Sequence, residues 1–164
     1  MDIIKKIFIS GNISMFLFIL VMIGGILNKK WNLTKLLLKI RPEFSILASL
    51  LIIPHIKFYS HKMPVDSSNV KVLILGYILG GLAFIIMIPL FITSFKNIRM
   101  KMMARKWRKI QRWAYLFYLL IYLHVMVLLF NKPNIHFSKI IFYTIIFGSY
   151  FVFKIKTSLK ERQI

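Results

Sequence analysis

The chain has 164 residues, of which 59% are hydrophobic and 15% aromatic, and its 24 Lys and Arg against 4 Asp and Glu give a formal net charge of +20. The hydrophobic fraction exceeds that of ordinary soluble domains, which excludes a soluble protein and predicts an integral membrane protein. The sequence contains no cysteine, which excludes disulfides, thiolate metal sites and a cysteine nucleophile.

Five apolar stretches are long enough to cross a hydrocarbon layer of roughly 30 Å. They lie at residues 7–27, 42–59, 72–95, 113–130 and 137–153. We expect the amphipathic residues 32–40 to lie along the membrane surface, and the second span to begin at Pro42, because proline suits a first helical turn. The predicted fold is all-α, a polytopic membrane bundle of about five transmembrane helices that forms a single domain over residues 1–164.

The basic residues are distributed unequally between the two sides of this predicted bundle. One side collects 17 of them, at residues 29–41, 96–112 and 154–162, and the other side collects 7. Since cytoplasmic loops are enriched in Lys and Arg, we expect a multi-pass plasma-membrane protein with its amino terminus outside and its carboxyl terminus in the cytoplasm. Basic residues that flank apolar spans favour anionic lipid headgroups as partners and argue against nucleic acid.

Two histidines fall within the predicted spans, His55 in the second and His124 in the fourth. They stand 14 and 12 residues after the basic anchors Arg41 and Arg112, which places them about 21 and 18 Å along helices that run in the same direction. Two imidazoles at nearly one depth suit the axial positions of a haem iron. The four acidic residues lie outside the spans or at their rim, which argues against an ion-coupled transporter.

The histidines allow a structural interpretation as well. Each imidazole could instead bond a helix carbonyl, and His55 could simply lie near the membrane surface. The alternative function is then a non-redox membrane bundle, such as an assembly factor or a small permease. We expect His61 and His136, in outer loops, to be solvated.

A longer pattern of residues extends over positions 10–129. In chain order it contains Gly11, Arg41, Phe44, Ser45, His55, Tyr59, Ile92, Thr93, Ser94, Trp107, Gln111, Arg112, Tyr115 and His124. With these residues the chain resembles the ferric-reductase-like transmembrane domain family, and within it most resembles the haem-binding membrane subunits of bacterial methionine-sulfoxide reductase systems. The resemblance implies that His55 and His124 occupy haem-ligand positions and that the protein takes part in electron transfer.

The chain departs from the family pattern at the inner haem position. Gln111 stands where the family has histidine, and the opposing position holds Arg41 or Pro42. An amide is a poor ligand for haem iron. We therefore expect one haem b near the outer face and doubt that a second, inner haem binds.

The expected function follows from one haem and from the lack of a Gly-rich nucleotide fingerprint. Electrons would come from quinol or from a separate flavoprotein and pass to an extracytoplasmic redox partner protein. On this hypothesis the chain is an electron-transfer subunit of an oxidoreductase system rather than a complete enzyme.

Overall fold

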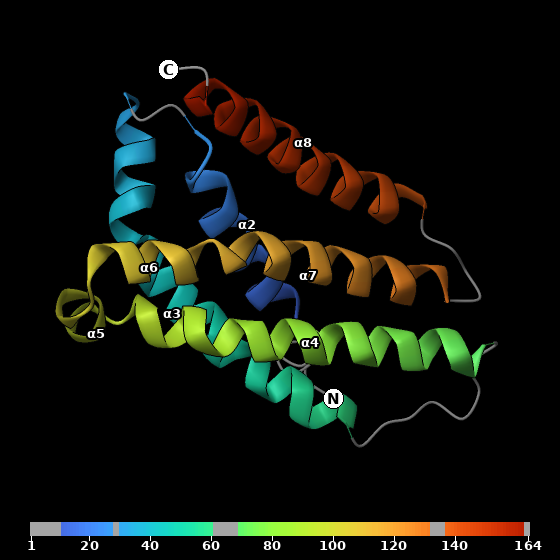
Figure 1. Cartoon of the computed structure of the whole chain (residues 1–164). Helices are drawn as coiled ribbons and strands as arrows, with labels where there is room; N and C mark the ends of the chain where they lie inside the picture. Colours follow the sequence, from blue (N-terminus) through green and yellow to red (C-terminus); the bar gives the residue numbers. More distant parts are fainter. Residues whose placement is uncertain (1–10, 28–29, 61–68, 132–136, 163–164) are drawn as a thin grey trace. The chain divides into compact units, whose positions relative to one another are not determined.

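The computed structural model describes residues 11–27, 30–60, 69–131 and 137–162, and every regular element within these ranges is an α-helix (Figure 1). The predicted all-α membrane fold is confirmed. Contacts gather into two compact units. The first comprises Met1–Pro64 with Phe91–Lys101, and the second comprises Val65–Leu90 with Met102–Ile164.

Within the described residues, three helical segments are long and apolar enough to cross a membrane: Val70–Ser94, Ala104–Phe130 and Phe137–Lys156. They contain most of the third span and all of the fourth and fifth spans that the sequence predicts. Many of their large apolar side chains are exposed, as lipid contact requires. On the first of them, the exposed large apolar residues are Val70, Ile74, Leu75, Ile78, Leu82, Ile85, Ile88 and Ile92.

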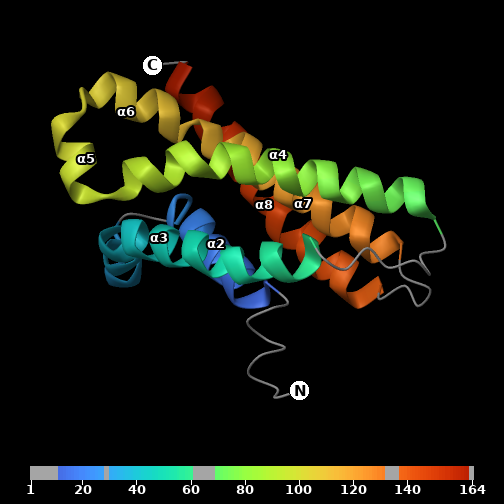
Figure 2. The same cartoon turned by 90° about the horizontal axis from the view of Figure 1, so that it is seen from below.

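The first unit is built on the antiparallel helices α2 (Asn12–Gly24) and α3 (Asn32–Ser60), which lie side by side in Figures 1 and 2. Small residues allow their close approach. The Ser14 hydroxyl donates to the carbonyl of Ala48 at 2.8 Å, and both residues are almost completely buried. The part of the first predicted span at residues 7–10 lies outside the described residues.

Helix α3 corrects the predicted boundary at Pro42. The surface segment 32–40 and the second span form one helix of 29 residues that contains Pro42 and Pro54. Proline removes one backbone donor and bends a helix without necessarily ending it, provided that packing compensates. Figure 1 shows the light-blue first turns of α3 running in a different direction from its teal remainder, which is consistent with a bend near Pro42.

Helix α4 (Val70–Ser94) begins at Asn69, whose side-chain carbonyl accepts from the Val72 amide at 3.4 Å, the usual role of an N-cap residue. The basic segment at residues 96–112, which the sequence analysis treated as a loop, contains two short helices, α5 (Lys96–Lys101) and α6 (Ala104–Gln111). Most of their basic side chains are exposed, and the sequence has no acidic residue between Asp66 and Glu161.

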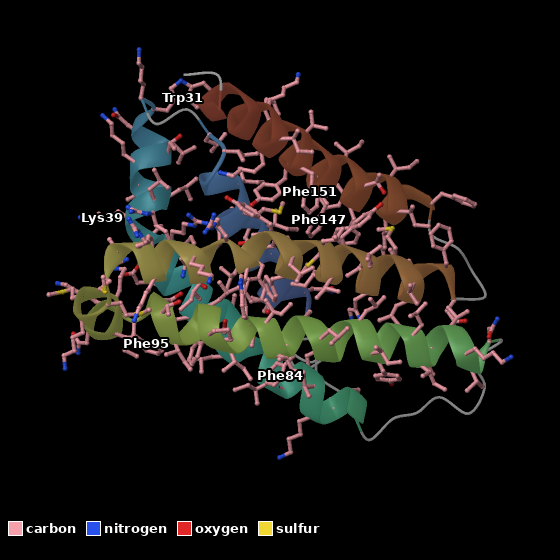
Figure 3. All side chains as sticks on the ribbon, in the orientation of Figure 1. Trp31, Lys39, Phe84, Phe95, Phe147 and Phe151 are labelled. Carbon is pink, nitrogen blue, oxygen red and sulfur yellow. The ribbon has the colours of Figure 1, made fainter. Side chains whose placement is uncertain are left out.

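In the second unit, aromatic rings pack α7 (Trp113–Phe130) against the antiparallel α8 (Phe137–Arg162). Tyr118 and Tyr150 meet edge to face with ring centroids 5.5 Å apart. Tyr122 lies 5.6 Å from the ring of Phe147, and its hydroxyl is 3.2 Å from the Thr144 hydroxyl. Figure 3 shows Phe147, which is 2% exposed, between the two ribbons.

Candidate functional site

His55 lies in α3 and its imidazole packs against Gly11, the residue that precedes α2. A Cβ added at Gly11 would stand 3.0 Å from His55 Nδ1 and 3.2 Å from Cγ. Gly11 also has φ +72°, a left-handed conformation that glycine adopts without steric strain. Glycine at this position therefore serves both the backbone turn into α2 and the space that the His55 ring occupies.

The position of this ring follows from how α2 and α3 pair. Antiparallel packing brings Gly11 to His55 at one end and Gly25 to Arg41 at the other. Between these points the Ser14 to Ala48 hydrogen bond fixes the register. Three separated contacts thus position His55 relative to the start of α2, all of them within the first unit.

His124 lies in α7 and packs against α4 within the second unit. Its Nδ1 is 2.7 Å from the carbonyl oxygen of Gly76. A Cβ added at Gly80 would stand 3.0 Å from both Nδ1 and Cε1 of the ring. At Gly76 such a Cβ would instead meet Leu128 Cδ2 at 2.9 Å, so Gly76 and Gly80 face successive turns of α7.

The contact with Gly76 determines which nitrogen of His124 carries the proton. A carbonyl oxygen can only accept, so Nδ1 must be the donor. In a neutral imidazole, Nε2 then holds the lone pair. Histidines that ligate metals usually have this arrangement, in which one ring nitrogen donates to a carbonyl or carboxylate and the other coordinates. The chemistry at His124 therefore fits an axial haem ligand.

The other residues singled out from the sequence occupy less informative positions. Gln111 is the last residue of α6 and is half-buried. Arg41 and Pro42 lie within α3, whereas His61 and His136 lie outside the described residues. Within the ranges that the structure describes, no three His, Asp or Glu side chains come together as a metal cluster.

Sequence reasoning missed the role of Gly76 and Gly80. The predictions from the sequence did not connect either glycine with a histidine. The available signal was the four-residue spacing of Gly76 and Gly80, which places both on one helix face. Gly81 is exposed and has no atom within 4 Å of an added Cβ.

Comparison with known proteins assigns the family. The pattern described as ferric reductase like transmembrane component matches residues 8–122. The chain belongs to this family. Membership suggests an electron-transfer function in the membrane, in agreement with the resemblance seen in the sequence. The matched residues include His55 and stop two positions before His124.

An uncharacterized protein of Treponema pallidum (strain Nichols) is 28% identical over 168 residues. The alignment covers 94% of this chain and 45% of that relative, so the chain spans about half of the relative's length. No solved structure matches the chain significantly.

Proposed function

We propose that this member of the ferric reductase-like family is a b-type cytochrome, with residues 1–164 as one haem-binding domain. His55 and His124 would hold a single haem near the outer face of the membrane. The proposal rests on family membership, on the matched depth of the two histidines in the sequence, and on the chemistry of each imidazole within its own unit.

The observation that carries the proposal is the hydrogen bond from His124 Nδ1 to the Gly76 carbonyl, at 2.7 Å. It fixes a proton on Nδ1, so that Nε2 has the lone pair that a ligand must donate. Bound haem would supply a one-electron carrier whose reduction potential depends on its axial ligands and surroundings. The chain's own contribution would be to hold the His124 imidazole with its proton on Nδ1 and to keep the His55 ring packed against Gly11.

The proposed partners follow from the chemistry of such a carrier. Electrons come from quinol or a separate flavoprotein and leave to an extracytoplasmic redox protein, as the resemblance to methionine-sulfoxide reductase membrane subunits implies. The exposed basic residues of α5 and α6 bind anionic lipid headgroups, each contributing about 1 kcal/mol near such a surface.

We also propose that the chain lies in the plasma membrane with its amino terminus outside. The basis is the excess of Lys and Arg on one side, 17 against 7. A topology reporter fused after Ile164 should be active in the cytoplasm. Activity of that fusion only on the outer side would contradict the proposed orientation.

The experiment that tests the haem is a pyridine haemochrome assay on the purified chain, together with its absorption spectrum before and after dithionite. We expect about one haem per chain, low-spin, with sharpened α and β bands on reduction. His55→Ala or His124→Ala should lose the haem or convert it to high spin, because each removes one of two strong-field ligands. His61→Ala and His136→Ala serve as controls and should retain the native spectrum.

Two results would contradict this proposal. A chain that contains no haem after expression with ample haem is not a cytochrome. Two haems per chain would exclude the single-haem arrangement.

The hydrogen bond of His124 also supports a second candidate, a non-redox membrane bundle in which the imidazole only joins α7 to α4. A buried imidazole bonded to a carbonyl stabilises helix packing whether or not it binds a metal. In that case His124→Ala would lower thermal stability, and no variant, nor the native chain, would show a Soret band.

A further inference from the structure

The contacts between α4 and α7 follow a simple register. Gly80 faces His124, and Gly76 faces Leu128 one turn further along α7. Gly76 is buried, and its carbonyl accepts from the imidazole. A helix carbonyl has two lone pairs, so it can accept this bond in addition to its helical partner.

The two glycines have different effects on the ring. At Gly80, an added Cβ would lie 3.0 Å from both Nδ1 and Cε1 of His124, tighter than nine in ten such contacts in proteins, so the ring would have to move by a few tenths of an ångström. At Gly76, an added Cβ would meet the flexible end of Leu128, and the carbonyl would remain. Gly80 therefore leaves space for the imidazole, and the Gly76 carbonyl accepts the hydrogen bond from Nδ1.

We infer that α4 positions the haem ligand of α7. Gly80 leaves the space in which the His124 ring lies. The Gly76 carbonyl accepts a hydrogen bond from Nδ1, which keeps the proton on Nδ1 and leaves Nε2 as the coordinating nitrogen. This inference rests on the proposed function for its purpose, although the geometry stands without haem. Gly76 and Gly80 are positioning residues, since neither would touch the iron. A second consequence concerns the reduction potential of the haem. The hydrogen bond that Nδ1 donates makes the imidazole a stronger electron donor to the iron, which favours oxidised iron.

The first test uses the full-length chain without haem, in lipid nanodiscs, with ¹⁵N-labelled histidine rings. The ¹⁵N shifts distinguish an imidazole protonated on Nδ1 from one protonated on Nε2, and loss of a signal in His124→Gln assigns the resonance. We expect the native His124 to be protonated on Nδ1. Native His124 protonated on Nε2 would overturn the inference, and this measurement needs no altered glycine.

The second test compares neighbouring glycines of α4. Gly80→Ala should displace the ring and give a mixture of the two tautomers, whereas Gly81→Ala, which adds a methyl group where no atom lies within 4 Å, should give the native signal. Gly76→Ala should also keep the native tautomer, because it retains the carbonyl. Equal His124 signals in Gly80→Ala and Gly81→Ala would overturn the inference.

The third measurement separates the inference from the proposed function. In haem-loaded protein, Gly80→Ala should keep its haem but raise the midpoint potential and change the low-spin electron paramagnetic resonance signal, while Gly81→Ala should change neither. A midpoint potential identical in Gly80→Ala and Gly81→Ala would overturn the inference. If no form binds haem but the tautomer results hold, the positioning role of α4 is supported and the cytochrome proposal fails.

Discussion

The two candidate ligands are held by different means in the two units. His55 packs against Gly11, a residue whose left-handed backbone begins α2. His124 packs against Gly80, a residue inside the regular helix α4, and bonds a second residue of that helix. Gly11 serves both a left-handed backbone turn and the space of the His55 ring, whereas Gly80 lies in a regular helix and serves only the space of the His124 ring. Glycine at a histidine contact can therefore be required for two separate physical reasons.

This comparison predicts that Gly11→Ala has a larger effect than Gly80→Ala. Alanine at position 11 meets the His55 ring and also enters a left-handed conformation that costs about 1–2 kcal/mol, whereas alanine at position 80 meets only the His124 ring. We expect Gly11→Ala to lower the thermal unfolding temperature and haem retention more than Gly80→Ala does. The check is thermal unfolding followed by haem absorbance and by circular dichroism.

Ser14→Ala provides the matched control for Gly11. It lies three residues after Gly11, in α2, and the change removes the hydrogen bond to Ala48, worth about 0.6 kcal/mol in membrane proteins. We expect a small loss of stability and a native spectrum. If Gly11→Ala were no more harmful than Ser14→Ala, the left-handed turn would have no part in positioning His55.

The smallest effect is expected at Gln111. A histidine placed there tests whether one new imidazole is enough to create a second haem site. Gln111→His restores the family residue, but the opposing position holds Arg41 or Pro42, neither of which ligates iron. We expect the haem content to stay at about one per chain by pyridine haemochrome assay. A clean rise to about two would show that another residue completes an inner site.

The helices differ in how far the sequence predicted them. The fourth span was predicted at residues 113–130, and α7 occupies Trp113–Phe130, because an uninterrupted apolar stretch ends at charged or polar residues on both sides. The predicted helix start at Pro42 was wrong. Proline was taken as a helix start at position 42, yet α3 continues through it, because packing against α2 compensates for the lost backbone bond.

The candidate site also contains residues that the sequence predicted and residues that it did not. His55 and His124 were identifiable from the sequence, since an imidazole within an apolar span is unusual and suggests function. Gly76 was not identifiable as a partner of His124, because these residues are 48 positions apart. Glycine also has no side-chain functional group from which a role could be predicted.

By itself, the sequence determined the membrane environment, the helical class, the lack of thiol chemistry and the identity of the two candidate ligands. These properties depend on composition and on local runs of residues, which are the same in any arrangement of the helices. The tertiary structure alone decided that Gly11 and Gly80 adjoin the two imidazoles and that Nδ1 of His124 carries a proton. Those facts depend on the register between separate helices, and register is set by close packing across the chain rather than by any local pattern.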